Sequence, residues 1–201
     1  MPLWIKGLIL GLCIAAPVGP IGILCIKRTL HSGRWAGVFS GLGAACADAI
    51  FGVIAAFSLT SLSSFLLHYQ AYFKLAGGIF LLYLGLKTFF EKPTTEDAPK
   101  RAEYLASAFS STFALTLTNP MTILSFMAIF AGIGLNIGSS NYTEASQLVI
   151  GVFFGSLAWW LFLAELVTLF RKRVNASLMR WINRLAGCLI FLFGLLALLL
   201  V

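Results

Sequence analysis

The sequence contains few charged residues. Charged side chains make up 10% of the 201 residues and apolar side chains 60%, whereas an average soluble chain is about 25% charged. A water-soluble globule of this size would need more polar surface. The composition therefore excludes a soluble globular domain, a disordered chain and a nucleic-acid-binding protein, although the formal net charge is +7.

The sequence also lacks the residue groupings that carry enzyme, metal or cofactor chemistry. No nucleophile–base pair, glycine-rich phosphate loop or H-E-x-x-H motif is present. The four cysteines lie in apolar segments without the spacing of metal ligands. We therefore expect no enzyme activity, no cofactor and no metal site. The cysteines are interpreted as small buried hydrophobic residues: Cys13, Cys25, Cys46 and Cys188.

Long apolar runs are the dominant feature of the chain. A bilayer core about 30 Å thick requires roughly 20 apolar residues per helix. The sequence predicts an all-α integral membrane protein with six transmembrane helices at about 3–26, 35–58, 71–90, 104–131, 145–170 and 182–201. They form one transmembrane domain, in which a hydrophilic linker at 91–103 joins a first half, 1–90, to a second half, 104–201.

The basic residues predict the orientation of these helices. Of the 14 Lys and Arg residues, only Lys6 and Lys74 fall on one side of the proposed topology. We therefore expect a bacterial inner-membrane protein. The positive-inside rule places both of its termini on the periplasmic side and the 91–103 linker on the cytoplasmic side. The other basic residues follow the first, third and fifth helices: Lys27, Arg28, Arg34, Lys87, Lys92, Lys100, Arg101, Arg171, Lys172, Arg173, Arg180 and Arg184.

The two halves resemble each other. Three segments recur in the same order: 19–24 (GPIGIL) and 119–124 (NPMTIL), 37–41 (GVFSG) and 151–155 (GVFFG), and 74–77 (KLAG) and 184–187 (RLAG). Because each half has three helices, the halves must lie in opposite orientation, which is the inverted repeat of many secondary transporters. Rows of glycines are expected to let helices pack closely: Gly33, Gly37 and Gly41 in one half, Gly151 and Gly155 in the other.

Proline interrupts two of the predicted helices. Pro17, Gly19 and Pro20 lie past the middle of the 3–26 helix, and Thr118-Asn119-Pro120 lies within the 104–131 helix. Proline removes a backbone donor and clashes with the carbonyl four residues earlier, so both helices should be kinked or unwound. In an inverted repeat, the half-helices after Pro20 and Pro120 would both begin near the midplane and could hold an anionic group. These six residues are the candidates for substrate binding. The alternative is that the two proline motifs are simple helix kinks with no role in binding.

Asp48 lies near the middle of the 35–58 helix. A carboxylate at the bilayer centre costs roughly 2.5–3.5 kcal/mol, so a functional role is favoured over a purely structural hydrogen bond. Asp48 could carry a proton, because burial disfavours the charged form, or pair with a substrate ammonium. Glu165 is expected to form an interfacial ion pair near Arg171 and Lys172. Trp159 and Trp160 lie in the middle of the 145–170 helix, where one of them could line the cavity or both could face lipid.

The motifs together resemble the LysE/RhtB amino-acid exporter superfamily. The resemblance covers nearly the whole chain and rests on residues 17–20 (PVGP), Asp48, 74–78 (KLAGG), 83–85 (YLG) and 118–120 (TNP). It implies export of amino acids or related metabolites from the cytoplasm, driven by the proton gradient. The lysine-exporter branch has a Gln-Asn pair after its Gly-Pro, where this chain has Ile21 and Gly22, which disfavours lysine or arginine as the substrate.

The superfamily also offers other functions. Its thiol–disulfide electron carriers have paired cysteines in the first and fourth helices, but residues 104–131 contain no cysteine. A cadmium exporter could use Cys46 and Asp48, although residues two apart on a helix point in different directions. A channel is disfavoured because two broken helices around one acid suit alternating access. The expected partners are thus a small-molecule substrate, protons and membrane lipid, and the glycine-rich faces could support a homodimer.

Overall fold

A computed structural model describes residues 2–17, 19–56, 68–90, 101–119, 122, 125–126, 142–171, 174 and 176–199. All regular structure in this part of the chain is helical, which confirms the all-α fold class. Seven helices are described: α1 (Leu3–Ala15), α2 (Pro20–Ser32), α3 (Arg34–Ala56), α5 (Gln70–Phe90), α6 (Arg101–Thr118), α8 (Tyr142–Arg171) and α9 (Ala176–Leu199).

Three helices are long and apolar enough to cross a membrane by themselves, namely α3, α8 and α9. The pair α1 and α2 passes the same test as one bent span, and α5 contributes a shorter apolar stretch at Leu75–Phe90. The described part of the predicted 104–131 helix is α6, which ends at Thr118. The arrangement of six spans therefore stays a prediction, because most of the chain beyond Asn119 and up to Tyr142, together with the 91–100 part of the linker, lies outside the described residues.

The first predicted transmembrane helix, 3–26, is broken at the position where proline was expected to interrupt it. Helix α1 ends at Ala15, α2 begins at Pro20, and the two meet at an angle of 80°. Pro20 occupies the first turn of α2, where an N–H has no intrahelical acceptor and proline costs nothing. Gly19 is extended, and its carbonyl accepts the first hydrogen bond of α2 from the amide of Ile23 at 3.1 Å. The break gives the membrane-embedded chain a new helix N-terminus.

Lys27 and Arg28 do not lie in a loop, as the sequence predicted, but inside α2. The helix continues to Ser32, and Lys27 is only 8% exposed. Its ammonium donates to the Thr88 hydroxyl of α5 at 3.3 Å. The Arg28 guanidinium donates to Ser40 of α3 and to three oxygens of α6, those of Ala108, Ser111 and Thr112. These polar partners offset the cost of removing two cations from water.

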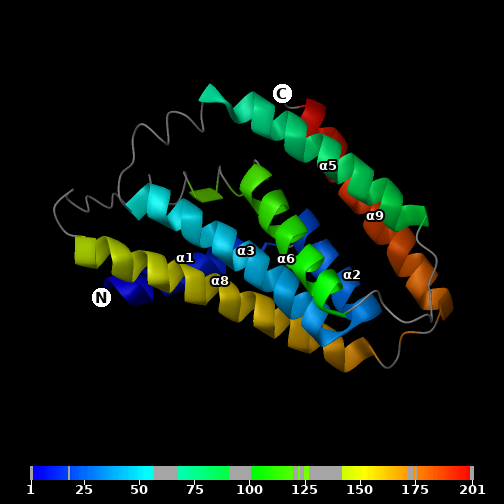
Figure 1. Ribbon diagram of the computed structural model, residues 1–201, viewed down its shortest axis with the longest axis horizontal. Helices are drawn as coiled ribbons and strands as arrows, with labels where there is room; N and C mark the ends of the chain where they lie inside the picture. The colour runs from blue at the N-terminus through cyan, green and yellow to red at the C-terminus, as the bar shows by residue number, and fades with distance from the viewer. Residues whose placement is uncertain are drawn as a thin grey trace.

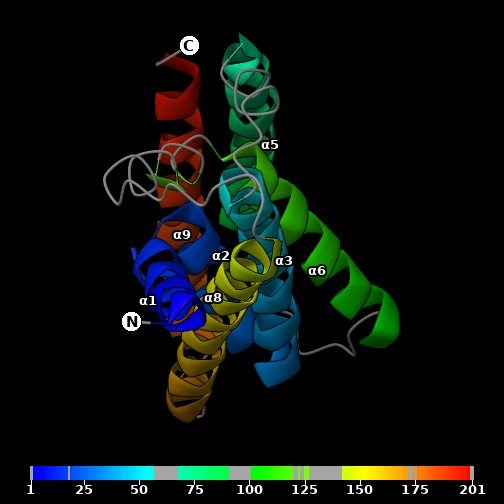
Figure 2. The ribbon, with the colours of Figure 1, turned by 90° about the vertical axis from the view of Figure 1, so that its left-hand side faces the viewer.

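Glycines bring α1 and α8 into backbone contact. A Cβ atom on Gly151 or Gly155 would overlap the carbonyl oxygen of Trp4 or Leu8, so the predicted close packing is confirmed for this row. In Figures 1 and 2, α1 lies beside the first half of α8. Two glycines of α1 outside the predicted rows, Gly7 and Gly11, meet α8 in the same way.

The matching row on α3 packs against different partners. Gly37 faces the Thr29 hydroxyl of α2, and Gly41 faces the Trp160 side chain of α8. Gly33 is a turn residue rather than a packing residue: its φ of +94° reverses the chain between α2 and α3. Arg171 stabilises this turn by donating to the carbonyls of Leu30 and His31 at the end of α2.

Helices α5 and α9 form a pair of their own. They lie side by side in both ribbon views, and in Figure 1 they lie on the opposite side of the molecule from α1 and the first half of α8 (Figures 1 and 2). Gly78 approaches Gly194, and Gly85 approaches Gly187 and Phe191, so these glycines allow the two backbones to touch. Much of the surface of this pair is exposed and apolar, which includes Ile79, Leu192 and Leu195.

Candidate functional site

A cavity of about 200 Å³ lies at the break between α1 and α2. Four other helices close it: α3 through Asp48, α6 through Thr116, α8 through Trp160 and α9 through Phe193. Its walls are mostly apolar, with a few polar groups, as expected for a small-molecule site. The full lining is Ile14, Ala15, Pro17, Gly19, Pro20, Ile21, Asp48, Thr116, Asn119, Thr122, Ser125, Trp160 and Phe193.

The cavity brings together most of the residues that the sequence singled out. Pro17, Gly19, Pro20, Asp48 and Asn119 all line it, although they come from three separate parts of the chain. The unwound segment between the helices exposes the first turn of α2 to this space, where amide N–H groups have no intrahelical acceptor. A helix N-terminus of this kind attracts an anionic group.

Two of the predicted residues are not placed in the cavity. The Thr118 hydroxyl turns back to its own helix and donates to the Ala114 carbonyl at 2.9 Å, because it has a local acceptor one turn earlier. Its carbonyl packs against Gly77 of α5. Pro120 lies outside the described residues, and so does most of the half-helix expected to follow it.

Asp48 is buried in the middle of the bundle. Its side chain is 3% exposed, and the hydroxyl of Ser156 on α8 donates to its Oδ2 atom at 2.6 Å. The Trp160 indole in turn donates to the same hydroxyl oxygen at 3.1 Å. Since a serine hydroxyl has one proton to donate, the indole donor orients this proton toward Asp48. The hydrogen bond that the carboxylate accepts thus comes from a neutral hydroxyl group.

No basic side chain pairs with Asp48 among the residues that the structure describes. The carboxyl group can therefore take up a proton or bind the cationic group of a ligand in the cavity. Asn119 provides a second polar group, 7% exposed, whose amide donates to the Thr122 hydroxyl at 3.0 Å. The cavity thus has an acidic wall, an amide and a helix N-terminus.

The role of Ser156 was not predicted from the sequence, and the position of Trp160 was left open. Ser156 is fully buried and Trp160 is 4% exposed, so neither faces outward. The available signal was the position of Ser156, a polar residue in an apolar run next to a packing glycine. Such a residue faces the bundle interior when it can share a hydrogen bond across helices.

Glu165 forms the expected ion pair, and its described partner is Arg34 of α3. Lys172, one of the two basic residues expected near it, lies outside the described residues. The expected burial of the cysteines needs correction. Among the cysteines only Cys25 is buried, whereas Cys13 and Cys188 are exposed and Cys46 is partly exposed. An apolar surface is tolerated where helices face lipid, so burial of a small apolar side chain is not required there.

The chain has clear relatives. A family model described as "LysE type translocator" matches residues 12–200. The chain belongs to the LysE type translocator family. It is 28% identical to a Bacillus subtilis (strain 168) protein named "Putative amino acid efflux protein YcgF", a match that covers 96% of this chain and 94% of the relative. It is 27% identical to the membrane protein YahN of Escherichia coli (strain K12), over 85% of this chain and 77% of the relative. No solved structure matches.

Membership in the LysE type translocator family decides the class of function. The protein is a membrane transporter and not an enzyme. A cadmium exporter, one of the functions that the sequence left open, needs thiol or carboxylate ligands for its cargo. Within the described residues of this LysE type translocator, no three His, Cys, Asp or Glu side chains come together in a way that could hold a metal ion.

Proposed function

We propose that the protein exports amino acids or related small metabolites from the bacterial cytoplasm by proton-coupled alternating access. The observation that carries this proposal is the cavity in which Asp48 faces the first turn of α2. An amino acid has one anionic and one cationic group. The carboxylate would bind the N–H groups of α2, and the ammonium would bind Asp48.

The coupling follows from competition for Asp48. When the carboxylate holds a proton it cannot bind an ammonium group, and when it binds substrate it has released the proton. Exchange of a proton for substrate on opposite sides of the membrane would drive export. Ser156 supports this role because it keeps the carboxylate in place while donating a single hydrogen bond. The relative named for amino acid efflux is consistent with this class of substrate.

Alternating access requires two halves that move against each other, and the helix packing supports two inverted repeats of about 1–90 and 104–201. The first helix of one half packs on the second helix of the other, since α1 contacts α8 and α6 contacts α3. The third helices pair with each other: Gly78 meets Gly194, and Gly85 meets Gly187. Exchange of the halves would leave this pattern unchanged, as expected for a two-fold repeat.

The test is efflux from proteoliposomes loaded with a panel of neutral, acidic and basic amino acids or with Cd²⁺. Each cargo is measured with and without an imposed pH gradient. We expect efflux of one or more amino acids that accelerates when protons can enter in exchange. Transport of Cd²⁺ alone would instead support a cadmium exporter, and amino acid flux that ignores the pH gradient would exclude proton coupling.

Asp48→Asn tests the role of the carboxyl group directly. Asparagine keeps the size of the side chain and its hydrogen bonds but can neither hold a negative charge nor release a proton. We expect the variant to insert and fold while losing accumulation against a gradient. Glu165→Gln is the matched control, because Glu165 is paired with Arg34 and does not line the cavity. Normal uphill export by Asp48→Asn would show that the acid is structural.

A further inference from the structure

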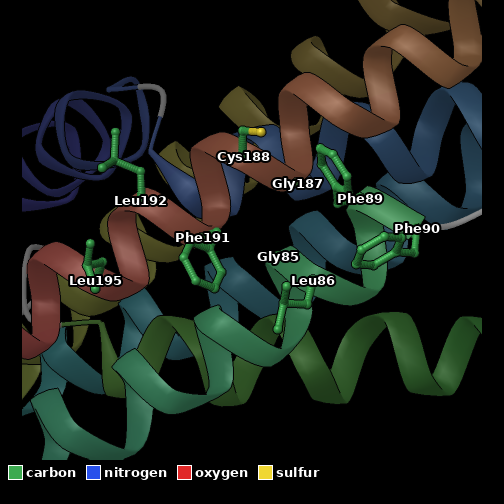
Figure 3. A pocket seen from close by; sticks show the side chains of 9 residues that line it. All are labelled: Gly85, Leu86, Phe89, Phe90, Gly187, Cys188, Phe191, Leu192 and Leu195. Atoms are coloured by element: carbon green, nitrogen blue, oxygen red, sulfur yellow. The ribbon is translucent and has the colours of Figure 1, made fainter.

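A second and larger hollow lies on the outside of the α5–α9 pair. It measures about 470 Å³ and is lined by both helices, with Phe89 and Phe90 at the end of α5 and Cys188, Phe191 and Leu195 along α9. Figure 3 shows these side chains on neighbouring turns of the two helices. The lining contains no charged group and no hydroxyl, so the hollow is an apolar groove.

The face of α9 that lines the groove continues toward the start of the helix with basic residues. Arg184 lies one turn before Cys188, and Arg180 lies one turn before Arg184. Residues four apart share a helix face, so both arginines extend the line of the groove. Trp181, which is 60% exposed, lies beside them, as aromatic residues do at a membrane interface.

Both arginines are exposed. Within the described part of the chain, neither has a hydrogen bond or an ion pair with another side chain. The face thus begins with two cations and continues with an apolar groove. From Gly187 to Leu195 the helix rises about 12 Å, which fits within one leaflet of a hydrocarbon core about 30 Å thick.

We propose that this groove binds an anionic glycerophospholipid. One acyl chain lies between α5 and α9, and the phosphate headgroup contacts Arg184 and Arg180. Charge complementarity selects this occupant, because a second copy of the chain would bring the same two arginines against each other or leave them beside apolar surface. A zwitterionic lipid would fill the groove but would gain less from the arginines.

The test measures lipids that stay bound to the purified full-length chain in native mass spectrometry. The probes are phosphatidylglycerol and phosphatidylcholine with identical acyl chains. Each basic residue near a membrane surface contributes roughly five-fold to anionic lipid binding, so two arginines predict a preference of about 25-fold for phosphatidylglycerol. Equal retention of the two lipids by the wild-type chain would overturn the proposal.

Two sets of variants locate the site. Arg180→Gln with Arg184→Gln should remove the preference, whereas Lys6→Gln should keep it, because Lys6 lies on α1 and not on the α5–α9 pair. Cys188→Trp should fill the groove and lower retention of both lipids, whereas Leu189→Trp, on a neighbouring face of α9, should not. Far-UV circular dichroism checks that each variant folds.

Other results would identify a different occupant. A dimer that persists without lipid and is broken by Cys188→Trp would make the groove an interface between copies of this chain. A preference for phosphatidylglycerol that survives the double arginine variant would place the anionic site elsewhere. Either result refutes the proposal without affecting the export function, which depends on the separate cavity at Asp48.

Discussion

Ser156→Ala should show how strongly the candidate site depends on a single hydroxyl group. In the folded protein this hydroxyl donates to Asp48 at 2.6 Å and accepts from Trp160 at 3.1 Å, with all three groups buried. A hydrogen bond to a charged group contributes about 1.5–3 kcal/mol and a neutral one about 0.5–1.5 kcal/mol. The two bonds share one oxygen and are not additive, so we expect a loss of about 2–3 kcal/mol.

That loss should appear in both stability and transport. The free energy of unfolding, measured by denaturant titration in mixed micelles, should fall by this amount. Because 1.4 kcal/mol corresponds to ten-fold, proton-driven efflux should fall by roughly 30- to 140-fold if the same contacts hold Asp48 during transport. Trp160→Phe removes only the indole donor and should cost less, about 0.5–1.5 kcal/mol.

Ser110→Ala is the matched control for this experiment. The Ser110 hydroxyl is on α6 and bonds only to the carbonyl of Ala106 one turn earlier, at 2.8 Å, on an exposed face. Its removal should change stability by less than about 0.5 kcal/mol. If Ser156→Ala behaves like Ser110→Ala in both assays, Ser156 does not position the carboxylate.

Three further predictions concern the break, the packing and the orientation. Pro20→Ala should let α1 and α2 join into one helix, which removes one or more hydrogen bonds from α2 N–H groups to the substrate carboxylate. Binding of a transported amino acid should therefore weaken by roughly ten-fold, while binding of its amide should change little. Equal losses for the acid and the amide would mean that the proline only shapes the bundle. Gly155→Ala should lower the free energy of unfolding by about 1–3 kcal/mol, because the new Cβ would overlap the Leu8 carbonyl. Gly52→Ala, whose Cβ would make only ordinary contacts near 3.5 Å, should be neutral or stabilising. Similar stabilities of the two variants would contradict the close α1–α8 packing. A cysteine placed at Pro2, in a chain without its native cysteines, should react with a membrane-impermeant reagent in intact cells, and labelling only after lysis would reverse the proposed topology.

Local chemistry made several features predictable from the sequence. The scarcity of charge and the long apolar runs indicate membrane helices because any other backbone would leave polar groups without partners in lipid. The break near Pro17 and Pro20 was predictable because proline cannot complete the hydrogen bonding of a helix interior. The glycines of α8 could be assigned to a helix contact because a missing side chain is useful only where another backbone approaches.

Tertiary structure decided what the sequence left open. Asp48 could be identified as a buried acid, but its partner on α8 lies 108 positions away, and no local pattern links the two. Whether Trp160 faces the cavity or lipid, and whether Arg28 lies in a loop or among the hydroxyls of α6, depends on how the helices rotate about their axes. Each residue type fixes only what it can do locally, whereas helix rotation and packing select its neighbours, and in this protein those neighbours turn a single acid into a candidate transport site.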